Sequence, residues 1–115
     1  FRWKGENVAT AEVEAITSQL DCVEMCACYG VQIPNNDGRA GMVTIVKHGN
    51  VDFEIDEIAN QLLEQLPKYA VPVFIRLKDR IDFTHTHKIK KFNLKKEGFN
   101  CEDEVFVMLP KNFFQ

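Results

Sequence analysis

The chain has 115 residues, of which 45% are hydrophobic and 27% charged, a composition typical of one soluble globular domain. A formal net charge of −3 argues against general nucleic-acid binding, and no apolar run approaches the ~20 residues of a membrane-spanning helix. The charge is uneven, because residues 1–67 carry 4 basic and 11 acidic residues whereas residues 68–115 carry 10 and 6.

The first twenty residues predict a hairpin followed by a helix. Residues 1–3 and 6–8 alternate as two short strand arms around Gly5, where glycine can supply an unusual backbone conformation. Thr10 has the character of an N-cap, and the helix runs over residues 11–20 with apolar side chains at helical spacing. Glu12 and Glu14 lie near its positive N-terminal end.

Two strands and a second helix follow. Residues 23–33, VEMCACYGVQI, predict a half-buried strand, and residues 40–49, AGMVTIVKHG, predict a β-branched one. The polar turn cluster between them makes the pair a hairpin. Asp52 can cap the next helix, which follows apolar spacing from Ile55 to Leu66 and ends at Pro67.

The last third of the chain predicts two short elements and a tail. VPVFIRL at residues 71–77 predicts an edge strand, because Pro72 cannot donate a ladder hydrogen bond. A short helix over residues 93–97 stops at Gly98, and the tail holds one apolar patch, VFVML, without a predicted partner. The order ββ-α-β-β-α-β-(α)-β predicts a small α+β domain with a two-stranded N-terminal hairpin and a roughly three-stranded sheet packed by helices.

Cysteines and histidines are the residue types that most often hold metals. The spacing of the cysteines, C-x3-C-x-C, does not match a zinc site, and small buried thiols in a reducing cytosol are the expectation. This favours a cytoplasmic protein. Two histidines at i, i+2 beside one aspartate have metal-ligating chemistry but no further anchor, so no metal site is predicted. The residues concerned are Cys22, Cys26, Cys28 and Cys101, and Asp82, His85 and His87.

Two polar stretches interrupt the pattern of elements. The first, RWKGEN at residues 2–7, is compatible with a plain hairpin turn. The second, THTHK at residues 84–88, favours a mobile polar loop on composition alone. The lysines that follow favour a solvated face, and the competing interpretation is a patch for a phosphate-bearing ligand or an anionic membrane surface.

Together, FRWKGENVATAEVE and THTHKIKK resemble the C-terminal domain of the adenylate-forming superfamily, which includes acyl-CoA synthetases, firefly luciferase and nonribosomal-peptide adenylation domains. The chain is most similar to the fatty acid transport protein/very-long-chain acyl-CoA synthetase group, whose first motif reads FRWKGENVxTxEV. Four further motifs match in order: YGV at residues 29–31, GRAGM at 38–42, LPxYAxPxFIR at 66–76 and KEGFN at 96–100. The resemblance therefore covers nearly the whole chain.

The resemblance implies that residues 1–115 are a single C-terminal lid domain of a larger fatty acid–CoA ligase, without its hinge and its N-terminal ATP- and acyl-binding domain. Such enzymes use ATP and Mg²⁺ to form an acyl-adenylate, after which the lid rotates and coenzyme A displaces AMP. The implied partners are the N-terminal domain of the same polypeptide, fatty acid, ATP and coenzyme A, with no nucleic acid. The fragment alone is expected to be inactive and to bind no cofactor stably. A peripheral membrane contact of the parent enzyme stays open.

Lys88 matches the invariant lysine of the superfamily's last motif, which implies a catalytic role in adenylation. A compact ammonium that stays charged at neutral pH can neutralise the negative charge that develops in the transition state. Transport-type relatives usually carry Thr-Gly-Thr-Phe-Lys here, whereas this chain has His85 and His87 in that motif. These departures put the geometry of the lysine loop in doubt.

The hairpin motif implies further site residues. Gly5 matches the glycine that lines the pantetheine tunnel for coenzyme A, and Lys4 and Glu6 are assigned beside it. Arg2 and Asn7 match positions near the nucleotide. In the GRAGM motif, Arg39 is instead expected to make a structural salt bridge or a turn contact.

Two alternative functions stay open. The chain can be a stand-alone binding or interaction module that uses the lysine patch, or the lid of an adenylating enzyme whose acceptor is not coenzyme A. The sequence immediately upstream distinguishes them, because a hinge residue and a phosphate-binding loop would establish the ligase.

Overall fold

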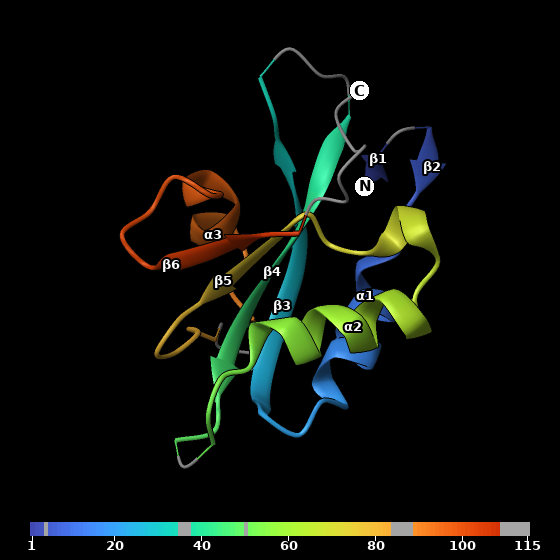
Figure 1. Cartoon of the computed structure of the whole chain (residues 1–115). Coiled ribbons are helices and arrows are strands. Elements are labelled where there is room, and N and C mark those ends of the chain that lie inside the picture. The colour runs from blue at the N-terminus through green and yellow to red at the C-terminus, as the bar shows by residue number, and fades with distance from the viewer. Residues whose placement is uncertain (4, 35–37, 50, 84–88, 109–115) are drawn as a thin grey trace.

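The computed structural model (Figure 1) describes residues 1–3, 5–34, 38–49, 51–83 and 89–108. The strands are β1 (Arg2–Trp3), β2 (Glu6–Asn7), β3 (Val23–Gln32), β4 (Arg39–Lys47), β5 (Phe74–Leu77) and β6 (Glu104–Val107). The helices are α1 (Thr10–Ser18), α2 (Ile55–Gln65) and α3 (Phe92–Glu97), with a 3-10 turn at Lys68–Ala70. In the part of the chain described here, every helix is too short or too polar to traverse a bilayer.

One four-stranded sheet forms the centre of the domain, in the order β3-β4-β5-β6. The pairs β3–β4 and β5–β6 are antiparallel, whereas β4 and β5 are parallel because α2 forms the crossover between them. The predicted α+β fold and its N-terminal hairpin are confirmed, but the sheet has one strand more than the rough prediction of three. The prediction of an edge position for β5 is wrong, because β6 pairs with it and Pro72 lies before its first residue.

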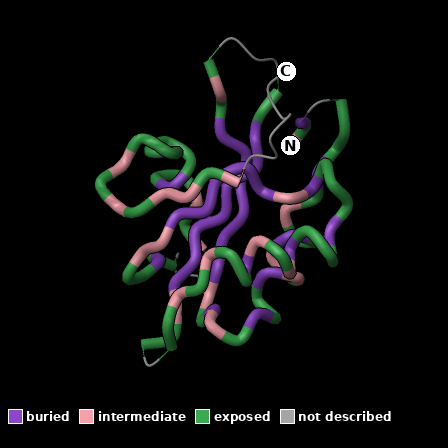
Figure 2. Tube along the Cα trace, in the orientation of Figure 1, coloured by how far each residue is buried: buried purple, intermediate pink, exposed green. Residues whose placement is uncertain are grey.

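Helices pack on both faces of this sheet. α1 packs against β3 and α2 on one face, while α3 contacts β3 from the other, where Phe74 and Phe99 stack with ring centroids 4.7 Å apart. Figure 2 shows that buried residues are concentrated in the strands. The interpretation of β3 as half-buried is therefore wrong, since the strand is buried throughout residues 26–31.

Both long helices begin without a side-chain cap. α1 begins at Thr10 itself, so the N-cap position falls on Ala9, and the N-cap of α2 is Glu54. The predictions of caps at Thr10 and Asp52 are therefore wrong. The predicted stop of α3 is confirmed, because Gly98 follows its last residue with φ +54°, a conformation that suits glycine.

A buried arginine connects β5 to the C-terminal end of α3 and the start of β6. The side chain of Arg76 is 3% exposed, and its Nε and Nη2 donate to Asp103 Oδ2 at 2.9 and 2.6 Å. Nη2 also donates to Glu97 Oε2 at 3.2 Å. We name these three residues the Arg76 clamp. Its two carboxylates satisfy a charge that would otherwise be costly to bury.

Candidate functional site

The hairpin β1–β2 brings three of the predicted site residues together. Arg2 and Asn7 lie opposite each other in the register, and Arg2 Nη1 donates to Asn7 Oδ1 at 3.0 Å. Arg2 Nη2 donates to the carbonyl oxygen of Gly5 at 2.7 Å. Gly5 has φ +82°, and apart from its neighbours in the chain no atom of the described residues lies within 4 Å of the position that a Cβ would occupy. The corner is therefore braced by Arg2, while the space beside Gly5 is open.

The other two residues predicted on this hairpin are not part of that arrangement. Lys4 lies outside the described residues. Glu6 pairs with Trp3 in the register and is exposed. The structure thus groups Arg2, Gly5 and Asn7 but leaves the assignments of Lys4 and Glu6 as predictions.

Phe1 seats the hairpin on the sheet. Gly30 and Gly41 face each other across β3 and β4. A Cβ on Gly30 would come within 2.9 Å of the Phe1 side chain, and one on Gly41 within 3.1 Å of Phe1 Cζ. The glycine pair therefore leaves room for the aromatic ring. The motifs YGV and GRAGM, which contain these glycines, correspond in this structure to the packing that orients the corner.

Residues 84–88, which include His85, His87 and Lys88, lie outside the described residues, but the chain on both sides of them is described. Phe83 and Ile89 form an antiparallel bridge, and the N–H of Lys90 donates to the carbonyl oxygen of Asp82 at 2.9 Å. Ile89 is partly buried and packs against the core. We name Asp82–Phe83 and Ile89–Lys90 the stem of the lysine segment. The stem fixes where this segment leaves and rejoins the domain.

Lys91, directly after the stem, is not the solvated residue that the sequence predicts. Its Nζ lies 3.1 Å from Glu14 Oε2, and the side chains of Lys91 and Glu14 are 28% and 24% exposed. The same oxygen of Glu14 accepts the backbone N–H of Cys28 at 2.9 Å. Sequence reasoning missed this pair because it placed Glu14 only by its position in α1, and no local pattern connects it to a lysine so far along the chain.

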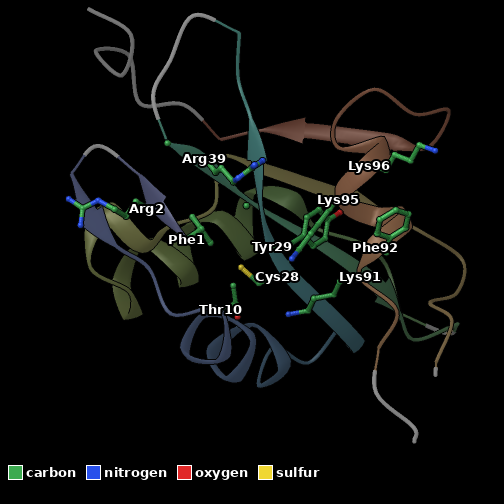
Figure 3. Close-up of a pocket in the computed structure, with 12 residues that line it drawn as sticks. Phe1, Arg2, Thr10, Cys28, Tyr29, Arg39, Lys91, Phe92, Lys95 and Lys96 are labelled. Atoms are coloured by element: carbon green, nitrogen blue, oxygen red, sulfur yellow. The ribbon is translucent and has the colours of Figure 1, made fainter. Parts of the chain in front are cut away.

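A groove of about 820 Å³ lies between the hairpin and α3 (Figure 3). Figure 3 shows Phe1 and Arg2 on one side, Lys91, Phe92 and the α3 lysines on the other, and Cys28 and Tyr29 of β3 between them. Its basic lining residues are Arg2, Arg39, Lys91, Lys95 and Lys96, and none of the 12 residues that line it is acidic. The groove can therefore attract a phosphate-bearing ligand.

The expected salt bridge of Arg39 is not found among the described residues. Arg39 is the first residue of β4 and is exposed. Its Cβ lies 2.9 Å from the position that a Cβ on Gly30 would occupy, so the base of the Arg39 side chain packs against Gly30. Arg39 contributes its charge to the groove, and the alternative of a turn contact stays a prediction because residues 35–37 lie outside the described residues.

The cysteines are free thiols. Cys26 and Cys28 are buried as expected, and burial raises the pKa of the Cys26 thiol to about 11 and that of the Cys28 thiol to about 12. Cys22 and Cys101 are only partly buried. Within the described part of the chain, no group of three or more His, Cys, Asp or Glu could hold a metal ion, although His85 and His87 fall outside that part.

The family model described as "AMP-binding enzyme C-terminal domain" matches residues 12–88. Long-chain fatty acid transport protein 6 of Mus musculus is 42% identical over 111 residues, which cover 94% of this chain and 18% of that protein. Medium/long-chain-fatty-acid–CoA ligase FadD6 of Mycobacterium tuberculosis is 42% identical over 110 residues, again 94% of this chain and 18% of the relative. The chain thus spans less than a fifth of the length of these curated relatives.

A solved structure has the same fold. The anthranilate CoA ligase AuaEII in complex with anthranoyl-AMP is similar with a TM-score of 0.76 and 23% sequence identity, over 84% of this chain and 19% of that one. At this identity the likeness concerns the fold alone. Together with the family match, these comparisons confirm the resemblance inferred from the motifs.

Proposed function

Because the chain belongs to the AMP-binding enzyme C-terminal domain family, we propose that residues 1–115 are the mobile lid of an ATP-dependent long- or very-long-chain fatty acid–CoA ligase. The observation that carries this proposal is the 42% identity, over 94% of the chain, to a protein named as a medium/long-chain fatty acid–CoA ligase. The N-terminal domain of the same polypeptide would hold most of the ATP, Mg²⁺ and fatty acid sites. The lid alone would be inactive.

The proposed reaction has two steps. The fatty acid carboxylate attacks the α-phosphorus of ATP, forming acyl-adenylate and releasing pyrophosphate. The thiol of coenzyme A then attacks the acyl carbon, forming the thioester and releasing AMP. We place both steps in the cytoplasm, with the parent enzyme in peripheral contact with the membrane that supplies its fatty acid.

Lys88 is the proposed catalytic residue of the first step. Its ammonium would neutralise carboxylate and phosphate oxygens as negative charge develops in the transition state. Displacement at phosphorus depends largely on positioning and charge compensation, so one aimed lysine has a large effect. The described stem supports this role, because it anchors the chain on both sides of residues 84–88.

The corner around Gly5 is the proposed element of the second step. The open space beside Gly5 suits passage of the thin pantetheine arm, with Lys4 and Glu6 flanking it. Arg2 and Asn7, which brace the corner from within, would approach the nucleotide. Rotation of the domain between the two steps would replace the lysine segment at the active site by this corner.

One observation favours a second candidate function, a stand-alone module that binds a phosphate-bearing ligand. Three lysines of the patch that the sequence presents, Lys91, Lys95 and Lys96, line one groove together with Arg2 and Arg39. The upstream sequence separates the two candidates, since a module would lack the phosphate-binding loop of a ligase.

The experiment that tests the proposed function is Lys88→Ala in the full-length parent enzyme. Adenylate formation, followed as pyrophosphate release, should fall by roughly 10²–10³-fold, the scale of removing one preorganised charged donor at a transition state. Thioester formation from preformed acyl-adenylate should be nearly unchanged. Lys90→Ala is the matched control, because the side chain of Lys90 is exposed and its removal should lower the adenylation rate only slightly. Adenylation by Lys88→Ala at the wild-type rate would refute the assignment.

A further inference from the structure

We infer that Glu14 is a positioning residue for the adenylating lysine, because its ion pair with Lys91 fixes the chain immediately after the lysine segment. This inference rests on the proposed function, since it assigns Glu14 a role in the first half-reaction. Neither Glu14 nor Lys91 was a candidate site residue on sequence grounds. Three contacts connect Glu14 and Lys91 to the central sheet and to the end of the lysine segment.

The first contact fixes the carboxylate itself. Oε2 of Glu14 accepts the N–H of Cys28 at 2.9 Å, and Cys28 lies in the edge strand of the central sheet. Cys28 is 1% exposed, and β3 pairs with β4 along nearly its whole length. Glu14 is thus held by α1, to which it belongs, and by a strand that is paired along nearly its whole length.

The second contact is the ion pair, through which the fixed carboxylate of Glu14 restrains the side chain of Lys91. The ammonium lies 3.1 Å from the same oxygen, and both partners are about three-quarters buried. A charged pair with little room for alternative rotamers keeps its geometry better than one that is fully solvated. Lys91 is also the N-cap residue of α3, so the pair sets where this helix begins.

The third contact is the stem. Lys91 follows Lys88 by three residues, a length of chain that spans at most about 11 Å. Ile89 packs on the core and bridges to Phe83, so the return of the chain is held at the bridge and again at Lys91. The described chain that directly follows residues 84–88 is therefore held at two points, Ile89 and Lys91.

A defined end point matters for the proposed chemistry because rate depends steeply on placement. A displacement of about 1 Å at a reacting group can cost on the order of 10² in rate. An ion pair that is still partly exposed to solvent, by contrast, contributes only about 0–1 kcal/mol to stability. Loss of the Glu14–Lys91 pair should therefore affect adenylation more than folding.

The test is Glu14→Gln in the full-length parent enzyme. Glutamine keeps an oxygen that can accept the Cys28 N–H and has nearly the same volume, but it lacks the charge that holds Lys91. We expect kcat for adenylation to fall about 10-fold with KM for ATP nearly unchanged, and thioester formation from preformed adenylate to stay within about twofold. Lys91→Gln should match it, and the double variant should lose no more than either single variant.

Two controls separate positioning from general effects. Lys91→Arg keeps the ion pair and should retain most of the adenylation rate. Lys68→Gln removes an exposed lysine that lies outside the groove and forms no ion pair within the described residues, and it should adenylate within about twofold of wild type.

Three results would overturn the inference: wild-type adenylation by Glu14→Gln, equal loss of both half-reactions, or additive losses in the double variant. Failure of the proposed function gives a different pattern, because Lys88→Ala would then adenylate normally. If Lys88→Ala is inactive in adenylation while Glu14→Gln is normal, only the role of Glu14 is overturned.

Discussion

The two ends of α3 are held to the sheet by ion pairs of opposite character. At its start, Lys91 and Glu14 remain about one-quarter exposed at the free edge of β3. At its end, the Arg76 clamp holds a guanidinium that is only 3% exposed. A partly exposed ion pair has a small desolvation penalty, and its loss changes the stability little. A buried charge that loses its partner, by contrast, destabilises the fold strongly. The comparison indicates that the clamp stabilises the fold and that the Glu14–Lys91 pair orients the lysine segment.

The largest expected effect on stability comes from breaking the clamp on its carboxylate side. Asp103→Ala leaves the buried guanidinium of Arg76 with Glu97 as its one remaining carboxylate partner, and should lower the free energy of unfolding of the 115-residue chain by about 2–4 kcal/mol. Arg76→Met should cost less, about 1–2 kcal/mol, because both carboxylates can then return to water. Urea unfolding at neutral pH measures both.

Lys91→Gln tests the Glu14–Lys91 pair in the same way and should lower the free energy of unfolding by less than about 1 kcal/mol. If Lys91→Gln destabilises the chain as strongly as Asp103→Ala, the distinction between a stabilising and an orienting pair is wrong.

A smaller effect concerns the thiols beside Glu14. Burial, with a further contribution from the Glu14 carboxylate, raises the pKa of Cys26 and Cys28 from 9.0 to about 11 and about 12. Below pH 9 both thiols are neutral in the folded and unfolded chains, so they add no pH dependence. Above pH 9 the unfolded chain releases these protons first, and the free energy of unfolding should fall by about 1.4 kcal/mol per pH unit for each thiol.

The measurement is urea unfolding at pH 8 and pH 10 under reducing conditions. The double variant Cys26→Ala/Cys28→Ala should show a shallower loss between these two pH values than wild type. The same loss in both proteins would mean that the thiols ionise alike in the folded and unfolded chains.

Much of the fold could be predicted because the signals are local. The glycine corner, the long hairpin of β3 and β4, the apolar spacing of α2 and the stop at Gly98 each depend on neighbouring residues. The placement of the last predicted strand could not be assigned, because VFVML is one short apolar patch whose partner strand lies about thirty residues away in the sequence. The cap residues of α1 and α2 were misassigned, because these helices use no side-chain cap.

The candidate site likewise contains a part that follows from local sequence and a part that depends on tertiary packing. Arg2, Gly5 and Asn7 come together because they share one tight hairpin, which the motif already implied. Glu14 and Lys91 are joined only by the tertiary packing of α1 against the edge of β3. One signal of the clamp was present in the sequence, since Arg76 is a lone charge within the apolar run VPVFIRL and such a residue requires partners if it is buried.

The central claim is that one domain carries two separate elements for the two half-reactions. The most direct test measures both half-reactions in the parent enzyme for Gly5→Leu, with Gly5→Ala as a matched control that carries the same positive-φ cost, about 1–2 kcal/mol, but only a methyl group. Apart from the neighbours of Gly5 in the chain, no atom of the described residues lies within 4 Å of the added Cβ, so we expect an obstruction where the corner meets the pantetheine arm.

We predict that Gly5→Leu forms acyl-adenylate at a rate near that of Gly5→Ala but makes at least about 10²-fold less acyl-CoA. Lys88→Ala should show the reverse, with adenylation lost and thioester formation from preformed adenylate retained. Loss of both half-reactions to the same extent in Gly5→Leu would contradict the account, because the corner would then serve only the fold.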